Sequence, residues 1–434
     1  MHNVLINGFS GGTAVPYSQA ASLSRPLGCR IAMTKPALSV FLLLSLSFLV
    51  SNLTAAAQDP NQTPNLVVDD DKVQCPAATF TSIQAAINAA SPGDLIRVCP
   101  GTYREQLSIN KSLSIEGDNG AIVLPSNMLP NTASPSGTPI AAAILVKNSA
   151  NVEIDGLIVD SDNNGITGCA PTLMGILYQN ASGTIEHNAV RNTKLHTARL
   201  IGCQSGGAIV VQSLGGGTSK VSINDNSVHN YQKNGITGNE LGTEVTITKN
   251  VVTGLGSVIG AAQNGIQIGY GGKGEVLGNT VTDNVWSPCV SITNCVYSAA
   301  GILIFESDDV RVENNSVATN QIGVYAGGGH NKIESNSISN SLVLVGIDLA
   351  GDNNLANDND VTNSGQAAIL IGGNQNEVLG NDITEAPIGI LEFSGIFGNA
   401  VSGNLFFDTL ISVQNPMPGH ISVPALIVQV APQR

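Results

Sequence analysis

The strongest constraint on the fold is a short unit that recurs nine times from about residue 185 onward: an aliphatic residue, two residues, an asparagine, one residue and a second aliphatic residue. The asparagines are Asn188, Asn226, Asn250, Asn279, Asn315, Asn336, Asn359, Asn381 and Asn404. A unit this short cannot bury its own apolar side chains, so successive units must stack on one another. The repeat therefore predicts a solenoid.

A second apolar segment, usually opening with glycine and an aliphatic residue, begins roughly 14 residues before each asparagine, as at Gly235-Ile236 and Gly346-Ile347. The later units repeat about every 22 residues. Leucine-rich repeats have a similar period, but they need a leucine-rich consensus and a helical half, whereas these units are β-branched and interrupted by glycine and asparagine. We therefore predict an all-β fold, a right-handed parallel β-helix of about twelve coils within residues 95–410.

Asparagine suits a tight corner between two strands because its side chain tolerates left-handed backbone angles and forms local hydrogen bonds. Stacked at one corner, the nine amides are expected to form a hydrogen-bonded ladder along the solenoid. Before the first coil, Thr81 or Ser82 is expected to cap a short helix with Ile83, Ala86 and Ile87 on one face. This helix would cover the apolar end of the solenoid.

The segment from Phe80 to Asp94, followed by Ile96-Arg97-Val98 and by Gly101 to Ile109, closely resembles the first coil of pectin-lyase-fold β-helix proteins. With the repeats, the resemblance covers about residues 79–410. The superfamily includes pectate lyases, polygalacturonases, pectin methylesterases, uronan epimerases and proteins without known activity. The resemblance therefore implies the fold, as a single domain over residues 79–434, and leaves the function open.

The first 57 residues have the pattern of a signal peptide. Lys35 precedes an apolar run at residues 37–50 and three alanines at residues 55–57, so we expect cleavage near 57/58, with Met33 as an alternative start. The run is shorter than the roughly 20 residues of a membrane span, which makes a membrane anchor the weaker alternative. Residues 58–78 are expected to be a flexible leader.

The charge of the chain is strongly negative. Because residues 1–57 hold Arg25, Arg30 and Lys35 and no acid, the chain from Gln58 onward carries 15 basic and 32 acidic residues, a formal charge of −17. Nucleic acid, which needs a basic surface, is therefore not an expected partner.

The cysteines fit an exported protein. Without Cys29, which precedes the proposed cleavage site, six remain, and an even number favours disulfides over free thiols. Fifteen pairings are possible, and sequence proximity favours Cys75–Cys99, Cys169–Cys203 and Cys289–Cys295. A zinc site is disfavoured, since no CxxC motif or matching histidine spacing occurs.

The first four full coils are longer than the later ones. From Gly175, successive coil starts at Gly207, Gly235, Gly265 and Gly301 are 32, 28, 30 and 36 residues apart, against 21–23 later. The extra residues lie mostly at 193–206, 231–234, 255–264 and 285–300. Loops at one position of successive coils project from one edge, where they wall the face of the opening strands. In enzymes of the resembled superfamily, a groove in that neighbourhood holds the polysaccharide.

Strand alternation predicts the floor of this groove. If Ile236, Ile266 and Ile302 point inward, the second residue after each opening glycine points outward. The expected floor comprises Leu177, Ile209, Thr237, Gln267, Leu303, Tyr325 and Asp348, extended by Asn239, Phe305 and Tyr270. Amides and rings suit sugars, so the candidate substrate-binding residues are Thr237, Asn239, Gln267, Tyr325 and Asp348. Ordinary surface residues of an all-β solenoid would give the same pattern.

The one basic concentration comprises His187, Arg191, Lys194, His196 and Arg199, on or beside the first long loop. These groups could neutralise a uronate carboxylate, and resemblance to polysaccharide lyases implies that an arginine acts as the base. Arg191, Lys194 and Arg199 are therefore the candidate catalytic residues. Pairing with local acids is the alternative interpretation.

Asp160, Asp162 and Asn164 match the first half of a calcium-binding loop. The closing carboxylate is missing because Pro171 occupies its position, so another acid such as Asp155 would have to substitute. An Asp/Asn-rich turn at a coil corner is the alternative to a calcium site.

A hydrolytic acid pair is harder to find. Glu306, Asp308 and Asp309 are close in sequence, but a solvated corner explains them equally well. The signature motifs of polygalacturonases, pectin methylesterases and alginate epimerases are absent.

Two functions follow as hypotheses. The first is an exported, monomeric protein that binds or modifies an extracellular polysaccharide, with elimination from a uronan as the first reaction class. The second is a non-catalytic surface, adhesive or structural β-helix. A periplasmic metal-loading protein is disfavoured, because only six histidines are scattered along the chain.

Overall fold

The structure, a computed structural model, describes residues 66–196, 202–289, 295, 297–414 and 429–430. All of them belong to one compact unit, Asn61–Arg434. The expected signal peptide at 1–57 and Arg199 lie outside the described residues. In the described part of the chain, no helix has the length and apolar character of a membrane span.

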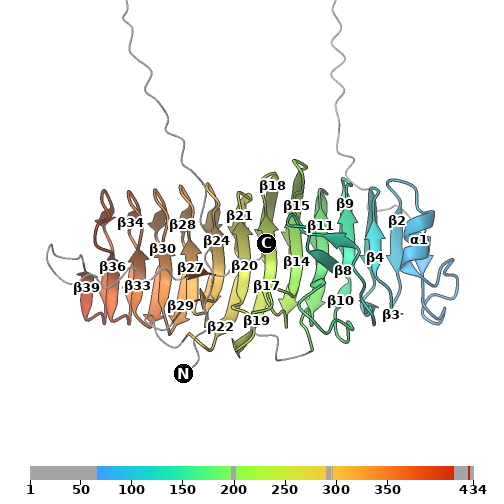
Figure 1. Cartoon of the computed structure of the whole chain (residues 1–434), viewed down its shortest axis with the longest axis horizontal. Coiled ribbons are helices and arrows are strands. Elements are labelled where there is room, and N and C mark those ends of the chain that lie inside the picture. Colours follow the sequence, from blue (N-terminus) through green and yellow to red (C-terminus); the bar gives the residue numbers. More distant parts are fainter. Residues whose placement is uncertain (1–65, 197–201, 290–294, 296, 415–428, 431–434) are drawn as a thin grey trace, which may run out of the picture. The chain divides into compact units, whose positions relative to one another are not determined.

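Three sheets, named A, B and C here, contain nearly all the strands (Figure 1). Sheet A holds β1 (Leu66–Val68), β2 (Leu95–Val98), β5 (Leu113–Gly117), β9 (Val152–Asp155), β12 (Gly183–Glu186), β15 (Ser219–Asn224), β18 (Thr243–Thr248), β21 (Lys273–Leu277), β25 (Arg311–Glu313), β28 (Lys332–Glu334), β31 (Leu355–Asn357), β34 (Glu377–Leu379) and β37 (Ala400–Ser402). Sheet B holds β3 (Gly101–Tyr103), β6 (Ala121–Val123), β10 (Ile158–Asp160), β13 (Ala189–Arg191), β16 (Ser227–His229), β19 (Val251–Val258), β22 (Thr280–Trp286), β26 (Ser316–Ala318), β29 (Ser337–Ser341), β32 (Asp360–Ser364), β35 (Asp382–Thr384) and β38 (Leu405–Phe407).

Sheet C holds the opening strands of the coils. They are β4 (Leu107–Ile109), β8 (Pro139–Lys147), β11 (Thr172–Gln179), β14 (Gly207–Gln212), β17 (Asn234–Asn239), β20 (Asn264–Gly269), β24 (Ala300–Phe305), β27 (Ile322–Ala326), β30 (Val345–Leu349), β33 (Ala367–Ile371), β36 (Ile388–Glu392) and β39 (Ile411–Gln414). Outside this path, β7 (Thr132–Ala133) pairs antiparallel with β8, and β23 (Tyr297–Ser298) pairs with β40 (Gln429–Val430).

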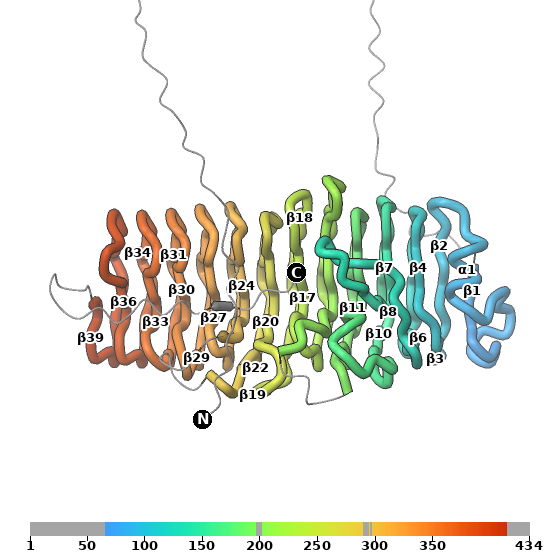
Figure 2. Tube along the Cα trace, in the orientation of Figure 1, coloured from blue at the N-terminus to red at the C-terminus, as the bar shows by residue number. Residues whose placement is uncertain are grey.

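Each coil runs from sheet C to sheet A to sheet B, and each strand pairs in parallel with its counterpart in the next coil (Figure 2). Sheet C has 12 strands along this path, which confirms the prediction of about twelve coils of a right-handed parallel β-helix. The register stacks one aliphatic row inside sheet C, for example Ile236, Ile266 and Ile302. All three lie in the continuous buried core.

The predicted asparagine ladder lies at the corner between sheets A and B. In each adjacent pair, such as Asn250 and Asn279, the backbone N–H and the side-chain amide of the earlier asparagine donate to the Oδ1 of the next, at 2.9 and 3.0 Å. The same contacts run from Asn188 to Asn404. The amides thus hold together coils whose backbones already pair through the sheets.

The backbone at this corner differs from expectation. The left-handed residue is the one before each ladder asparagine, such as His187 (φ 51°), Ser335 (φ 54°) and Asp358 (φ 52°). The prediction that asparagine is selected for left-handed angles is therefore wrong. The ladder position needs an amide because its side chain must donate and accept hydrogen bonds at once. The left-handed position before it is occupied by several residue types.

The N-terminal end is closed by α1 (Ile83–Ala89), as predicted. Ser82 caps it by accepting the N–H of Ala85 at 3.2 Å, and Ile83, Ala86 and Ile87 are buried against the first coils. The solenoid begins before residue 79. The strand β1 lies inside the segment expected as a flexible leader and already pairs with β2.

Three disulfides join Cys75 to Cys99, Cys169 to Cys203 and Cys289 to Cys295, which are the favoured pairings. The first of them ties residues before α1 to the end of β2. The second and third lie in or beside the long loops that precede β14 and β24.

Candidate functional site

The long loops lie at one edge of the solenoid, between the strands of sheet B and the following strands of sheet C. They connect β13 to β14, β16 to β17, β19 to β20 and β22 to β24. In the third loop, β19 continues to Val258 and pairs with β22 up to Trp286, so this part of the wall is itself a pair of strands. The loops thus stand next to each other on four successive coils.

A cavity of about 440 Å³ opens among the first three of these loops. Its lining residues are Lys194, Leu195, His196, Gln232, Leu255, Ser257, Val258, Ile259, Gly260, Ala261 and Gln263. Side-chain amides hold the loops in place. Gln232 accepts the N–H of Leu195 at 2.9 Å, and Gln263 accepts the N–H of Leu255 at 3.1 Å. The cavity combines an apolar wall with amides, a hydroxyl and two basic side chains, which suits a polar ligand with apolar faces.

The predicted basic cluster is divided by the fold. Lys194 and His196 line the cavity, whereas Arg191 donates to Asp160 at 2.8 Å and His187 lies beside Asp155 at 2.8 Å, at the A–B corner. In the described residues, no ion pair joins Lys194 to an acid. Lys194 is therefore the basic side chain that lines the cavity without an ion pair to any acid of the described residues.

His196 has two partners at its Nε2 atom. The N–H of Asn163 approaches it at 2.7 Å, and Oδ1 of Asp162 lies 3.3 Å away. A neutral ring accepts from Asn163, whereas a protonated ring pairs with Asp162.

The residues predicted to bind calcium form hydrogen bonds and ion pairs with other residues of the protein. Asp160 accepts from Arg191 and from Asn192, and Asp162 faces His196. Buried Asn164 donates to the carbonyl of Lys194 at 3.0 Å and accepts the N–H of Ile166. These contacts connect the turn at residues 160–164 to the cavity loop, so a structural role for this turn is visible without an ion.

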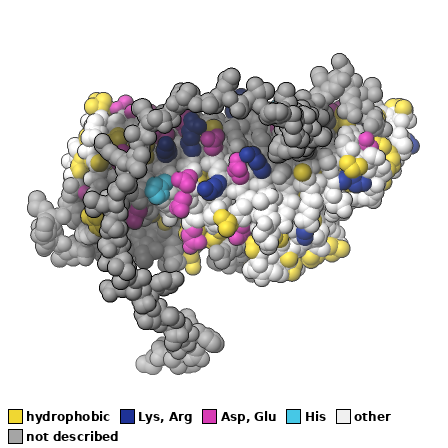
Figure 3. Space-filling view, turned by 90° about the horizontal axis from the view of Figure 1, so that it is seen from above, with side chains coloured by type: hydrophobic (Ala, Val, Ile, Leu, Met, Phe, Trp, Pro, Cys, Tyr) yellow, Lys and Arg dark blue, Asp and Glu magenta, His cyan; other side chains and the backbone are white. Residues whose placement is uncertain are grey.

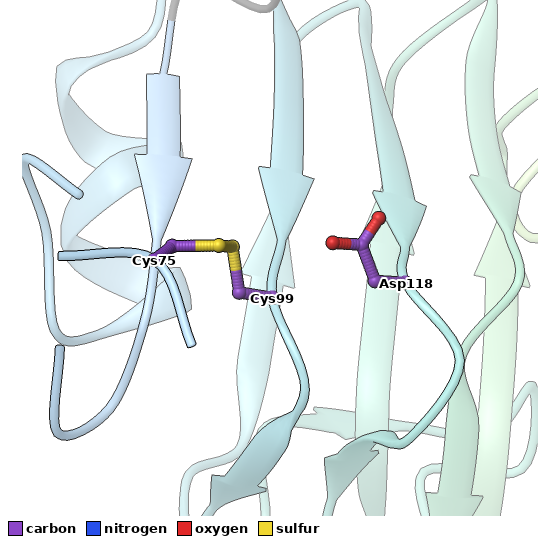
Figure 4. A group of neighbouring side chains, drawn as sticks. All are labelled: Cys75, Cys99 and Asp118. Carbon is purple, nitrogen blue, oxygen red and sulfur yellow. A yellow bond between two sulfur atoms is a disulfide. The ribbon is translucent and has the colours of Figure 1, made fainter. Parts of the chain in front are cut away.

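Besides the three neighbouring acids Asp69, Asp70 and Asp71, two mixed groups of described residues offer metal-type ligands. Figure 4 shows the first, in which Cys75, Cys99 and Asp118 come from neighbouring coils and the two sulfurs form a disulfide. Asp118 also pairs with Arg97 at 2.8 Å. A disulfide provides no thiolate for a metal. The other mixed group, Asp155, Glu186 and His187, is exposed or half-buried and is held by the His187–Asp155 contact.

The expected groove floor is a register row, but it is buried. Thr237, Gln267, Tyr325 and Asp348 align on successive strands of sheet C, and Asn239 stands in the adjacent row. Thr237, Gln267, Asn239 and Asp348 are each at most 5% exposed. Tyr325 is half-buried.

The prediction that Ile209 belongs to this outward row is wrong. It aligns with Ile176 and Ile236 in the core, and Val210 occupies the outward position. The equivalent of Gly175 is Ala208, so the coil starts one residue later than Gly207 suggests.

The amides of the floor bind each other. Asn234 donates to Thr237 and to Gln267 at 3.0 Å, and Gln267 donates to Asn239 at 3.0 Å. Asn264 donates to Asn234 at 3.2 Å. This network uses hydrogen-bonding capacity that a sugar would need.

Two chain excursions cover the floor on either side of this network. Beside β7, Asn131 donates to the carbonyl of Ala142 and Thr132 donates to Gln179. On the other side, the Cys289–Cys295 pair packs in one apolar cluster with Leu303 and other outward residues of sheet C. Of the aromatic residues expected to extend the floor, Tyr270 and Phe305 contact each other edge to face, with ring centroids 5.5 Å apart.

Asp348 lies on this covered face. Its neighbours in the register row are Tyr325 and Leu370, and no hydrogen bond to its carboxyl group is found among the described residues. Burial raises the pKa of Asp348 to about 7. Burial, and then the charge of Asp348, raise the pKa of Tyr325.

Lys233 is a second buried ionisable group, and sequence inspection did not single it out. It is fully buried behind the cavity wall, where it donates to the carbonyl of Ala262 at 2.5 Å, and burial lowers its pKa to about 7. A lysine between Gln232 and an opening strand gave no sequence signal. Gln232, Gln263 and Ile259 were likewise missed as lining residues, since only loop length pointed to them.

The acids near residue 306 form corner contacts. Asp308 accepts the N–H of Gly329 at 2.6 Å, and Asp309 lies 3.8 Å from Lys273. On the face shown in Figure 3, basic and acidic side chains are mixed rather than gathered by sign. Some basic and acidic side chains form exposed ion pairs with each other, such as Lys220 with Glu244 at 2.8 Å.

Comparison with known proteins adds partial similarities. A family model described as "NosD: Periplasmic copper-binding protein (NosD)" matches residues 287–419. A cell surface glycoprotein of Methanothermus fervidus is 34% identical over 110 residues, which are 24% of this chain and 16% of that protein. The chain thus spans about one sixth of the length of this relative.

Solved structures align over more of the chain at low identity. The exopolygalacturonase of Thermotoga maritima shows 13% identity and a TM-score of 0.49, covering 76% of this chain and 83% of that one. The A-module of mannuronan C-5 epimerase AlgE4 of Azotobacter vinelandii shows 15% identity and a TM-score of 0.47, covering 77% and 93%. DFA-IIIase of Arthrobacter chlorophenolicus shows 16% identity and a TM-score of 0.48, covering 80% and 94%. The sheets themselves define the class: the protein is a right-handed parallel β-helix.

Proposed function

We propose that the protein is exported after removal of residues 1–57 and binds an acidic extracellular polysaccharide in the cavity lined by Lys194 and His196. The observation that carries the proposal is the cavity itself, formed by loops that successive coils hold side by side. Three disulfides and the similarities to a periplasmic family and a cell surface glycoprotein support the extracytoplasmic location.

The lining fits a uronan better than a neutral glycan. Lys194 offers a charge to a carboxylate, Gln232 and Ser257 offer hydrogen bonds to hydroxyls, and Leu255 and Ile259 offer apolar contact to a sugar ring. Because the chain from Gln58 onward has a formal charge of −17, an acidic polymer needs a local cation to bind it.

Binding can be tested with oligogalacturonate, oligomannuronate and a neutral glucan, using calorimetry at low and high salt. We expect binding to the two uronans, and we expect Lys194→Ala to weaken it at least about 10-fold by removing a charge-assisted contact. Lys220→Ala is the matched control, because Lys220 pairs with Glu244 on sheet A. Absence of uronan binding, or equal binding by the two variants, would refute the proposed site.

We further propose that the protein is an enzyme and that its reaction is elimination from a uronan. Arg191 is held by Asp160, which leaves Lys194 and His196 as the basic groups of the described residues that line the cavity. Incubation with the same uronans tests for an unsaturated product by its ultraviolet absorbance. Binding without such a product would instead favour the second candidate, a non-catalytic surface protein, which the similarity to a cell surface glycoprotein supports.

A further inference from the structure

An aromatic pair lies directly beside the cavity wall. That part of the wall is formed by β19 and β22, which lie side by side at the edge of the solenoid (Figure 2). Val258 of β19 lines the cavity, and the register pairs it with Trp286 of β22. Aligned residues of neighbouring parallel strands point to the same side of the sheet, about 4.8 Å apart. Trp286 therefore stands one strand beyond the cavity lining, on the side to which Val258 points.

The backbone of Trp286 is held in place by a buried amide. Fully buried Gln321 accepts the N–H of Trp286 at 3.4 Å and donates to its carbonyl at 3.2 Å. The same Gln321 oxygen accepts the N–H of Ala299 at 2.8 Å. Since Ala299 directly follows β23, one side chain fixes both strands that carry the aromatic pair.

The second ring of the pair is Tyr297 of β23. Its ring meets the indole of Trp286 edge to face, with ring centroids 6.0 Å apart. Tyr297 is 41% exposed. Trp286 is half-buried and packs on the apolar cluster that contains Cys289 and Leu303. Two rings held in this way offer a large contact area at little cost in side-chain entropy.

A hydrogen bond of its own does not explain the tryptophan. A buried indole usually donates its N–H, but Nε1 of Trp286 is buried and has no acceptor among the described residues. A leucine would pack on the same apolar cluster without leaving a donor unpaired. What tryptophan adds at this position is the extended aromatic face.

We infer that Trp286 and Tyr297 form a sugar-stacking subsite, which continues the polysaccharide site from the cavity along its wall. This inference rests on the proposed function, since one polysaccharide chain occupies both places. One face of a pyranose ring consists of C–H groups, which pack on an aromatic ring whether or not the sugar carries a charge. The described residues that line the cavity include no aromatic side chain, so the pair supplies a ring contact that the cavity lacks. Lys194 then recognises the charge of the ligand, and the aromatic pair recognises its ring face.

The hexamer of galacturonate and its fully methyl-esterified form test this inference, because they share the same ring faces and only the first is charged. Trp286 is the single tryptophan of the chain, so its fluorescence reports contact at the subsite. We expect both ligands to change the indole emission. Calorimetry should show that Trp286→Ala weakens the binding of each ligand at least about 5-fold. Lys194→Ala should weaken only the binding of the charged ligand.

Trp286→Phe keeps an aromatic ring and should recover most of the affinity, and circular dichroism checks that each variant is folded. Phe397→Ala is the matched control, because Phe397 is 67% exposed between β36 and β37, outside the cavity loops. It should bind both ligands like the wild type.

The outcomes separate the subsite from the cavity cation. Unchanged binding of both ligands by Trp286→Ala, or an indole emission that does not change at saturation, overturns the inference and leaves the proposed function standing. Weaker binding by Trp286→Ala together with unchanged binding by Lys194→Ala supports the subsite and refutes the role of the cation. A wild type that binds neither ligand removes the proposed function and the subsite with it.

Discussion

At the scale of single residues, each ladder asparagine makes several hydrogen bonds to the coils beside it. Asn279 accepts the backbone N–H and side-chain amide of Asn250, and it donates to the carbonyl of Ile247 at 2.9 Å and to Asn315 at 3.0 Å. It is 1% exposed. Each such amide therefore satisfies buried backbone groups that no water can reach.

Asn279→Ala should lower the free energy of unfolding by roughly 2–4 kcal/mol, because it leaves the buried N–H of Asn250 and the carbonyl of Ile247 without partners. Urea denaturation measures the loss. Asn224→Ala is the control, since the side chain of half-buried Asn224 bonds the partly exposed side chains of Thr248 and Glu186, and it should cost less than about 1 kcal/mol. Similar losses for the two variants would contradict this role of the ladder.

Asp348 provides a residue-scale test of the covered floor. Its pKa is about 7 in the folded protein, against an ordinary value of 3.8 for aspartate, so the folded state keeps a proton that the unfolded state loses between these pH values. The carboxyl's contribution to stability is thus fully present below pH 3.8 and is lost as the pH rises through about 7.

Asp348→Asn should therefore gain stability relative to the wild type as the pH rises from 4 to 7, by at most about 1.4 kcal/mol per pH unit. Thermal or urea unfolding of both proteins across this range measures the difference. Exposed Asp360→Asn is the control and should show little pH dependence. A pH-independent difference between the wild type and Asp348→Asn would show that the floor is open to water.

At the scale of secondary-structure elements, α1 depends on a carboxylate from the first coil. Glu105 accepts the Ser82 hydroxyl and the N–H of Ile83, both at 2.7 Å, and the N–H of Gln84 at 3.1 Å. A helix of 7 residues has little stability of its own. Its position over the open end of the core therefore relies on these three contacts and on its buried face.

Glu105→Ala should reduce the free energy of unfolding by about 1–3 kcal/mol, since three donors at the start of α1 lose their acceptor. Glu105→Gln should recover part of the loss, because the amide keeps one acceptor oxygen. Exposed Glu377→Ala on β34 controls for removal of an acid. An unchanged urea midpoint in Glu105→Ala would mean that apolar packing alone holds the helix.

At the scale of the whole molecule, stability should vary along the solenoid. Each coil contacts its neighbours, one end is covered by α1, and the strands of the last coil are largely exposed. Stacked repeats open most readily where a neighbour is missing.

Hydrogen exchange of the protein should therefore be fastest in β37, β38 and β39 and slowest in central strands such as β17. The strands β1 and β2 under α1 should exchange more slowly than the last coil, which provides an internal comparison. Uniform exchange along the chain would indicate that the coils open together rather than from the uncovered end.

The sequence by itself determined the architecture. Spacing of the ladder asparagines fixes the coil length, alternation in Ile236 and its equivalents fixes the inward face, and the Ser82 segment fixes the cap. These signals are local and periodic, so they can be read from the sequence without a structure. The shift at Ile209 shows the limit of this approach, since Ala208 stands where most coils have their opening glycine and only packing in the core set the register.

Only the tertiary structure decided the site. The expected floor around Gln267 is buried by its own amide network and by excursions such as the Cys289 loop, while Lys194 and His196 meet Gln232 and Gln263 in a cavity. Asp160 takes Arg191 as its partner, from the next coil. Which side chains meet between loops depends on contacts between residues far apart in the chain, and no periodic signal encodes those contacts.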